Sequence, residues 1–191
     1  MASPVAHSVI GLAMAILGWP MAGFPGALWW EGLKRVWPIW LACVILANAP
    51  DLDYLYGLPG GQLNAFHQTV THTGIWCLSL ILAVGLTDAG FHRRWWPRVW
   101  ILALVLVGSH LGIDWMTDDT SPPVGMMLGW PWSDQWFHAP WCLFPSGARK
   151  TVQDLMSWKN VWMVVAELAV TLPVLAGALG YHVFARRNDS T

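Results

Sequence analysis

Charged side chains are scarce in this chain of 191 residues. Asp, Glu, Lys and Arg together make up 11% of it, whereas an average soluble domain has about 25%. Hydrophobic residues contribute 55%, and the 16 tryptophans outnumber the 10 lysines and arginines combined. This composition excludes a disordered chain and a basic nucleic-acid-binding domain, so no nucleic-acid partner is expected. It indicates a single membrane-embedded domain, residues 1–191, whose partners include membrane lipid.

Cysteine is also scarce. The three cysteines, Cys43, Cys77 and Cys142, form no Cys-x-x-Cys pair, and two of them fall in apolar runs. This pattern excludes a secreted disulfide-stabilised scaffold and a zinc site built from thiolates. We therefore interpret the cysteines as small residues of the hydrophobic core.

Five apolar segments contain most of the hydrophobic residues. They span about Val5–Phe24, Val36–Ala49, Gly74–Leu86, Val99–Met116 and Val161–Ala185. A helix needs roughly 20 residues to cross the hydrocarbon core of a bilayer. The second and third segments are shorter and must therefore tilt, thin the bilayer or gain length from flanking tryptophans. The pattern predicts an all-α fold, a polytopic bundle of about four to five hydrophobic membrane helices.

Basic residues collect in alternate connections between these segments. Seven of the ten lie in three places: Lys34 and Arg35, the Arg93–Arg98 stretch, and Arg186 with Arg187. If the segments alternate in direction, these places share one membrane face, and the positive-inside rule assigns that face to the cytoplasm. The N-terminus and the connections 50–73 and 117–160 then face outward.

The connection 117–160 is rich in tryptophan and proline. It contains Pro122, Pro123 and the run WPWSDQW from Trp130 to Trp136. Aromatic residues and proline at a membrane boundary are typical of a cap that lies in the interface. Trp130, Trp132 and Trp136 either line an entrance for an acyl chain or form a plain interfacial belt.

Histidines and aspartates gather at the ends of four segments. The set comprises four of the seven histidines and three of the eleven acidic residues. Under the alternating topology, all of them lie at the outward face, where they can meet. Its members are His7, Asp51, Asp53, His67, His72, His110 and Asp114.

The spacing within this set leaves alternatives open. His110 and Asp114 are four residues apart, so a helix places both on one face, either to chelate an ion or to form a hydrogen bond that holds the helix end. Asp51 and Asp53 repel each other unless they are protonated or bind a cation, although they also suit a cap that ends the helix. His67 and His72 are five residues apart, about 140° around a helix. Either His67 precedes the helix, or the two histidines serve neighbouring ions.

The set as a whole predicts a metal centre. Ionisable groups at membrane depth are costly and usually functional, and His with Asp but without Cys favours zinc, manganese or iron. Seven ligands exceed the needs of one ion, so two or three divalent ions, zinc above all, are the natural interpretation. Thr69, Thr71 and Thr73 are candidates to orient the imidazoles.

A second set of acids lies just beyond the fourth segment. Asp118, Asp119 and Asp134 are either solvated loop acids or include a general base. Together with Asp51, Asp118 and Asp119 form the predicted catalytic set.

These motifs resemble the YdjM-like family, described as LexA-binding, inner-membrane-associated metal-dependent hydrolases. The resemblance runs from His7 to Ser133, and its ordered elements are H-x3-G, P-D-x-D, H-x4-H, H-x3-D, and D-x2-T followed by P-W-S. It implies an inner (cytoplasmic) membrane location and a distant similarity to zinc-dependent phospholipase C. In two places the chain departs from the family, with Gln68 where an Arg is usual and Asp119 near an expected Gly. If that Arg neutralises a phosphate in the family, Gln68 changes the charge expected of the substrate.

The prediction from sequence is a membrane-bound hydrolase that cuts a phosphoester or other ester of a lipid-like substrate at the outer face. One alternative is a divalent-metal transporter, which predicts ligands near the middle of the membrane. Only Glu167 lies mid-span, with no obvious partner. A second alternative is a non-catalytic membrane protein with a structural metal site.

Overall fold

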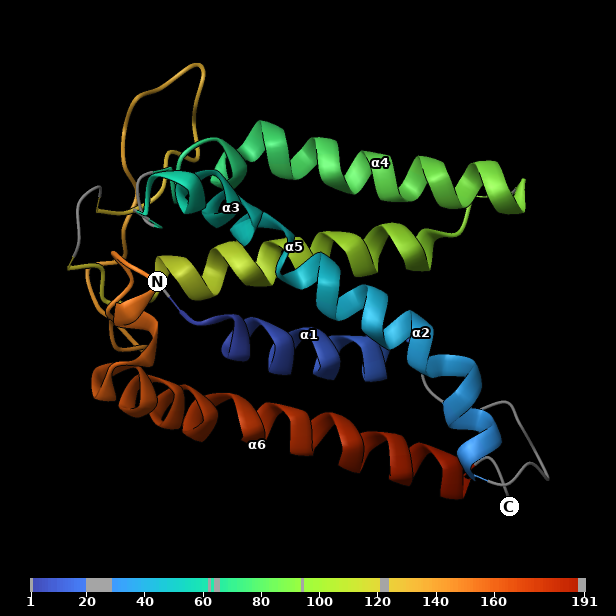
Figure 1. Cartoon of the computed structure of the whole chain (residues 1–191). Coiled ribbons are helices and arrows are strands. Elements are labelled where there is room, and N and C mark those ends of the chain that lie inside the picture. The colour runs from blue at the N-terminus through green and yellow to red at the C-terminus, as the bar shows by residue number, and fades with distance from the viewer. Residues whose placement is uncertain are drawn as a thin grey trace.

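Five long helices run side by side and alternate in direction along the chain (Figure 1). This computed structural model describes residues 2–19, 29–61, 63, 66–93, 95–120 and 124–188. The long helices are α1 (Pro4–Gly18), α2 (Trp29–Ala47), α4 (Gly74–His92), α5 (Pro97–Trp115) and α6 (Trp158–Asn188). Within these ranges the only bridge pairings are two isolated ones, Thr117 with Phe144 and Met126 with Phe137. The predicted all-α helix bundle is confirmed.

Local sequence chemistry sets where several helices begin. Ser3 caps α1, its hydroxyl accepting a hydrogen bond from Val5 N (3.2 Å), and Pro4 occupies the first turn. Thr73 caps α4 in the same way through Trp76 N (3.2 Å). Such caps satisfy backbone N–H groups that have no partner within the helix.

The apolar segments and the helices differ in length. Both α2 and α4 have 19 residues, so they are longer than the apolar runs within them, because each helix continues through polar residues at its end. In contrast, α1 ends at Gly18, and the predicted extension from Pro20 to Phe24 lies outside the described residues.

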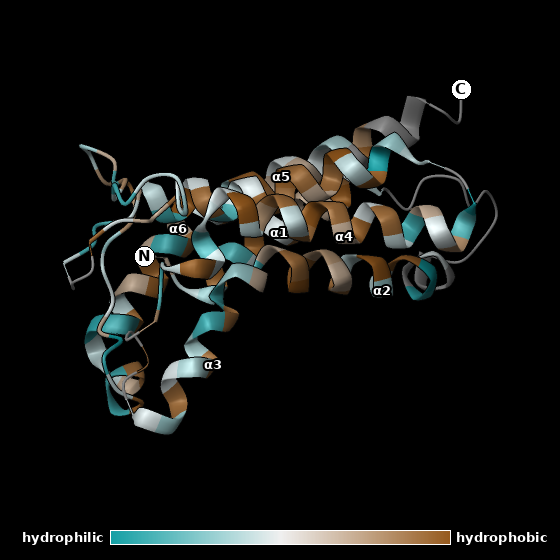
Figure 2. Cartoon of the chain, turned by 90° about the horizontal axis from the view of Figure 1, so that it is seen from above, coloured by the Kyte–Doolittle hydropathy of each residue, from teal (hydrophilic) through white to brown (hydrophobic). Residues whose placement is uncertain are grey.

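Three of the described helices are long and apolar enough to cross a membrane. They are α4, α5 and the Trp158–Tyr181 part of α6, whereas α1 is apolar but shorter. Hydrophobic residues dominate the middle of the bundle, and hydrophilic residues concentrate toward its two ends (Figure 2). Lys34, Arg35 and Arg93 lie at the end opposite the N-terminus, as the alternating topology predicts.

Helix α1 lies inside the bundle and packs against α2, α5 and α6. Small residues allow the close approach, because a Cβ atom added at Gly11 would lie 2.7 Å from Ala47 Cβ on α2. A similar fit joins α4 to α5, where a Cβ at Gly85 would lie 2.3 Å from the Trp100 ring. These contacts fix the relative heights of the helix ends that carry the predicted ligands.

Two irregular connections cover the end of the bundle at which the N-terminus lies (Figure 1). The first holds the 3-10 helices η1 (Ala49–Asp53), η2 (Leu58–Gly60) and η3 (Val70–His72), and the short helix α3 (Tyr54–Gly57). The second, from Thr117 to Ser157, includes η4 (Gln153–Met156). A backbone hydrogen bond from Leu63 N to Lys150 O (3.0 Å) joins the two connections. We call the second connection, Thr117–Ser157, the cap.

Candidate metal centre

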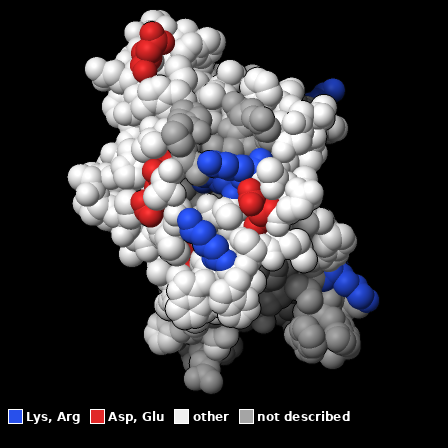
Figure 3. Space-filling view, turned by 60° about the vertical axis from the view of Figure 1, so that its left-hand side comes forward, with Lys and Arg blue, Asp and Glu red and all other residues white. Residues whose placement is uncertain are grey.

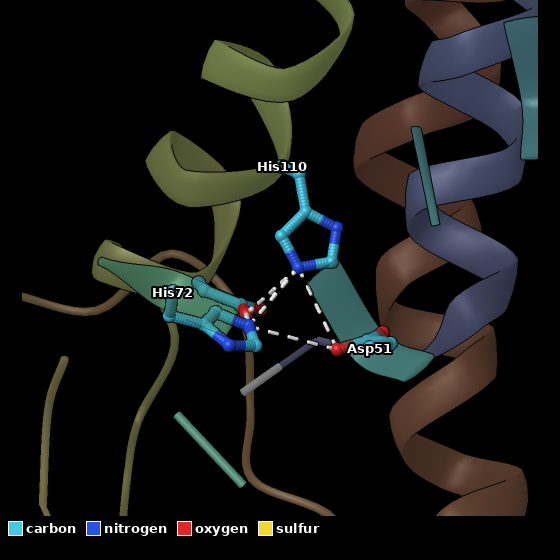
Figure 4. Close-up of side chains that lie close together, drawn as sticks. Asp51, His72 and His110 are labelled. Carbon is cyan, nitrogen blue, oxygen red and sulfur yellow. Dashed lines mark hydrogen bonds and ion pairs between the residues drawn. The ribbon is translucent and has the colours of Figure 1, made fainter. Parts of the chain in front are cut away.

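The structure brings all seven predicted ligand residues to this covered end of the bundle. His7 comes from α1, the two aspartates from η1, His67 and His72 from the connection before α4, and the last pair from α5. Every one of them is buried. His110 reaches from α5 toward His72 and Asp51 (Figure 4). The clustering expected from alternating helices is therefore present.

Four of these side chains point one atom each at a common centre. His72 Nε2 lies 3.2 Å from His110 Nε2 and 3.2 Å from Asp114 Oδ2. Asp51 Oδ1 lies 3.7 Å from His72 Nε2 and 3.5 Å from His110 Nε2, and His110 Nε2 lies 3.4 Å from Asp114 Oδ2. Bonds of 2.0–2.2 Å to a tetrahedral ion give ligand separations of about 3.3–3.6 Å. The four atoms fit such an ion.

Outer hydrogen bonds aim the two imidazole rings. His110 Nδ1 lies 2.7 Å from Ala47 O, a carbonyl that can only accept, so this nitrogen carries the proton. His72 Nδ1 faces Asp53 Oδ2 (3.3 Å) and Thr71 Oγ1 (3.1 Å). Both Nε2 atoms therefore present lone pairs to the centre. Carboxylate or carbonyl partners of this kind are the usual way in which metal-binding histidines are held.

The carboxylates at this centre have few protein donors. Neither oxygen of Asp51 has a hydrogen-bond partner among the described residues, nor does Asp114 Oδ2, and all three atoms are buried. Two imidazole nitrogens and two carboxylate oxygens converge there, an arrangement that a bound cation would neutralise. The residues present thus fit a divalent ion.

His7 provides a second position beside the first. Its Nε2 lies 3.3 Å from Asp114 Oδ1 and 4.0 Å from Asp51 Oδ2, the oxygens that face away from the first position. The ring stacks on His110 with centroids 3.8 Å apart, and neither of its nitrogens has a hydrogen-bond partner in the described part of the chain. His7 would therefore be available, with the second oxygens of Asp51 and Asp114, to hold a further ion.

Asp53 and His67 form an adjoining layer. Asp53 accepts from Gln68 N (3.2 Å) and Thr71 Oγ1 (2.7 Å), and its other oxygen lies 2.7 Å from His67 Nδ1. Burial raises the pKa of Asp53, but hydrogen bonds with His67 and His72 outweigh it and hold the pKa below its usual range. Asp53 is therefore an ionised carboxylate that orients two imidazoles.

His67 retains one nitrogen for a ligand. It lies in a turn before η3, which settles the open question of its five-residue separation from His72. Its Nε2 is buried without a hydrogen-bond partner, and burial lowers the pKa of the ring, which favours the neutral form that metals bind. Asp53, His67 and His72 form a second group whose ligand atoms lie close enough together that it could hold an ion.

The predicted threonines have separate roles. Thr71 contacts both Asp53 and His72, so it orients ligands as expected. Thr69 donates instead to Phe66 O, and Thr73 donates to Val70 O and caps α4. Only one of the three hydroxyls therefore supports the imidazoles.

The loop acids have different environments. Asp119 is buried and pairs with Arg149 Nη2 (2.6 Å), so it is not a solvated loop acid. It also accepts from Gly125 N (3.1 Å) and from the Gln68 amide nitrogen (2.8 Å) in the orientation that satisfies that amide. Asp118 is half-buried in the cap, and Asp134 is exposed.

The predicted tryptophans of the cap are all partly or largely exposed. Trp132 is 80% exposed, and Trp130 and Trp136 are 39% exposed each.

Glu167 has a partner that the sequence did not reveal. It is fully buried, and Ser3 donates to it through both its backbone N (2.7 Å) and its hydroxyl. The neighbouring Ala2 N donates to Asp114 Oδ1 (3.2 Å). The start of α1 is thereby fastened between α6 and the candidate metal centre. A lone acid within an apolar helix was the one signal that pointed to such a contact.

These features define a polytopic α-helical membrane protein with a buried His/Asp cluster at one end. Residues 1–187 match the family described as YdjM inner membrane protein, and the chain belongs to that family. It is also similar to the inner membrane protein YbcI of Escherichia coli (strain K12), with 36% identity over 141 residues, 64% of this chain and 75% of YbcI. No solved structure matches the chain significantly. An inner-membrane location follows from the relatives and the three candidate spans.

Proposed function

We propose that this protein is a metal-dependent hydrolase that cuts a phosphoester or other ester of a lipid-like molecule at the outward face of the inner membrane. The observation that carries the proposal is the pair of adjacent cation positions that share the Asp51 and Asp114 carboxylates. Ions held by these residues would supply a water of lowered pKa as nucleophile and would stabilise the charge that develops on an ester during displacement. Zinc, manganese and iron all suit the nitrogen and oxygen donors.

The protein's own residues hold this arrangement in place. His72, His110, Asp51 and Asp114 would hold the first ion, and His7 with the other oxygens of both aspartates would hold the second. His67 and Asp53 would hold a third or support His72. Burial of all these groups excludes bulk water, which strengthens their electrostatic effect on a reacting ester.

Catalytic roles outside the cluster are narrower than the sequence predicted. Asp51 belongs to the ligand set, and Asp118 stays a candidate general base in the cap. The carboxylate of Asp119 is held by Arg149 and Gly125, so we assign it a positioning role.

The position of the cluster supports hydrolysis over transport. A transporter needs ligands near the bilayer midplane, whereas these seven residues lie at helix ends and in connections. Glu167, the acid within the fifth apolar segment, is bound by Ser3 at the start of α1, close to the same end of the bundle. The outward orientation rests on the positive-inside rule applied to Lys34, Arg35 and Arg93.

Metal analysis of the purified protein tests the proposal directly. We expect about two divalent ions per chain after detergent extraction, the number that the shared-carboxylate geometry favours. Hydrolysis of a panel of lipid esters and phosphodiesters should stop on treatment with a chelator and return when zinc or manganese is restored. Fewer than one ion per chain, or activity that a chelator leaves intact, would contradict the proposal.

A further inference from the structure

A cavity of about 400 Å³ lies under the cap and beside the candidate metal centre. Its wall contains Ala2, whose N donates to Asp114, and Tyr54, whose ring stacks on His67 with centroids 4.3 Å apart. The cavity therefore shares residues with the surroundings of the metal cluster. A molecule bound in it would have one end next to the cluster.

Most of the remaining wall is apolar. Leu63, Leu155 and Met163 line the cavity, and the last of these lies in the first turns of α6. Such a surface removes hydrocarbon from water. Its place at the end of the bundle, next to the start of a membrane helix, makes it accessible to a molecule that comes from the lipid.

One charged side chain in this wall is only partly neutralised. Arg149 is 7% exposed, and its Nη2 binds Asp119 Oδ1 at 2.6 Å. Its Nε and Nη1 are buried and have no hydrogen-bond partner among the described residues. A buried guanidinium N–H without an acceptor is unfavourable. An oxyanion would provide acceptors for these two N–H groups, and the described residues contain none that does so.

The loop that carries Arg149 is held rigidly. Asn160 on α6 accepts from Ala148 N (2.7 Å) and donates to Ala148 O (2.7 Å). The Leu63 N–Lys150 O bond fixes the other side of the loop. Such preorganised donors lose little conformational entropy when a ligand binds.

The surface around the cap carries both basic and acidic side chains (Figure 3). Lys150 and Lys159 are exposed near Arg149 in the chain. Figure 3 shows that basic side chains gather near the middle of this end of the molecule, with acidic side chains on either side.

From this geometry we propose that the cavity binds the phosphate group of an amphiphilic substrate. The guanidinium of Arg149, which lines the cavity, donates to phosphate oxygens, while the hydrocarbon chains lie against Leu63, Leu155 and Met163. Guanidinium groups are well suited to such oxyanions. The inference rests on the proposed hydrolase function and narrows its substrate class to phosphate-bearing lipids.

Binding to the detergent-solubilised protein tests the inference without reference to turnover. The probes are dihexanoyl phosphatidate, which has phosphate and chains, dihexanoylglycerol, which has chains alone, and inorganic phosphate. Calorimetry should show phosphatidate binding at least tenfold more tightly than either of the others. Equal affinity for dihexanoylglycerol would refute the phosphate contact, and equal affinity for inorganic phosphate would refute the amphiphile.

Three variants locate the contact. Arg149→Gln should weaken phosphatidate binding at least tenfold, and so should the paired change Asp119→Asn with Arg149→Gln, which leaves no buried charge unpaired. Lys159→Gln removes the same charge from the exposed surface and should change affinity less than twofold. If Lys159→Gln matches Arg149→Gln, or if the paired variant binds as the wild type does, the inference is wrong.

Metal content, measured on the same samples, separates this inference from the proposed function. Arg149→Gln should keep the wild-type number of ions, because Arg149 contacts none of the seven candidate ligands. If Arg149→Gln keeps both the metal content and the phosphatidate affinity of the wild type, the Arg149 site is refuted and the hydrolase proposal stays intact. A metal-free wild type would refute the hydrolase proposal, whatever the lipid binding.

Discussion

The imidazole of His110 combines the two features that define a ligand in this cluster. Its Nδ1 donates to Ala47 O, and its Nε2 lies within 3.5 Å of atoms from His72, Asp51 and Asp114. Removing the ring eliminates one of the four candidate ligand atoms at the first cation position. The same change also leaves the Ala47 carbonyl without this partner, so a control must reproduce that loss.

We expect His110→Ala to lower metal affinity at least 100-fold, because even outer-shell partners of a metal typically contribute 10- to 100-fold. His138→Ala is the matched control, since the His138 Nε2 donates to Thr117 O (3.2 Å) but the ring lies outside the cluster. Metal content by mass spectrometry should fall below one ion per chain only in His110→Ala. Equal metal content in the two variants would remove His110 from the ligand set.

Sequence spacing could predict the candidate ligands and one of their supports, Thr71, but not the more distant contacts around them. The seven His and Asp side chains lie at helix ends that alternation brings to one face, so a topological argument reaches them. Gln68, Asp119 and Arg149 meet in connections whose course depends on tertiary contacts. Ser3 and Glu167 are 164 residues apart. No local periodicity links such partners.

At the level of helices, the packing of α1 against α2 determines where His7 lies. Gly11 follows His7 by one helical turn, and its bare backbone faces Ala47 on α2. The carbonyl of Ala47 is the group that holds His110. The H-x3-G motif therefore has a physical basis, because the Gly allows the helix that carries His7 to approach the helix end that positions His110.

Gly11→Ala should separate α1 from α2 and disturb both cation positions. The new Cβ would lie 2.7 Å from Ala47 Cβ, and overpacking of this kind typically costs about 1–3 kcal/mol. Gly177→Ala on α6 is the control, because a Cβ there meets no atom within 4 Å. We expect a lower melting temperature and reduced metal content for the first variant only. Wild-type metal binding in Gly11→Ala would show that close packing is not required.

Helix lengths mark a second limit of sequence reasoning. Hydropathy located all five long helices but undercounted α2 and α4, because their ends continue through polar residues such as Lys34, Arg35 and Asp88. At a membrane boundary, backbone hydrogen bonding favours further helix after the apolar run has ended. Apolar length therefore gives the span within lipid rather than the length of the helix.

For the whole molecule, we expect ions bound at the candidate metal centre to contribute to stability. The carboxylates and imidazoles of the cluster come from α1, α5 and the η1 and η3 connections, so ions held there join elements that are distant in the chain. Without a cation, the Asp51 and Asp114 carboxylates are buried close together, and their repulsion destabilises the folded state. Metal binding and tertiary structure are thereby linked.

Chelation should therefore lower the melting temperature in detergent. An ion at 100 times its dissociation constant stabilises a protein by about 2.7 kcal/mol, which for a chain of this size shifts the melting temperature by at least roughly 5 °C. Differential scanning fluorimetry with and without EDTA measures the change. His110→Ala should show a much smaller shift, because it has already lost metal. Equal shifts in both proteins would mean that EDTA acts elsewhere.

The orientation of the molecule in the membrane can be tested with its own cysteines. Cys43 and Cys77 are buried within α2 and α4, as predicted, but Cys142 is exposed in the cap, so its interpretation as a core residue is wrong. If the cap and metal centre face outward, a membrane-impermeant maleimide should label the wild type in intact spheroplasts but not Cys142→Ser. In a Cys142→Ser background, Arg93→Cys places a thiol at the opposite end of the bundle, so it should react only after permeabilisation. The reverse pattern would place the cluster in the cytoplasm, and the substrate would then have to come from the inner leaflet.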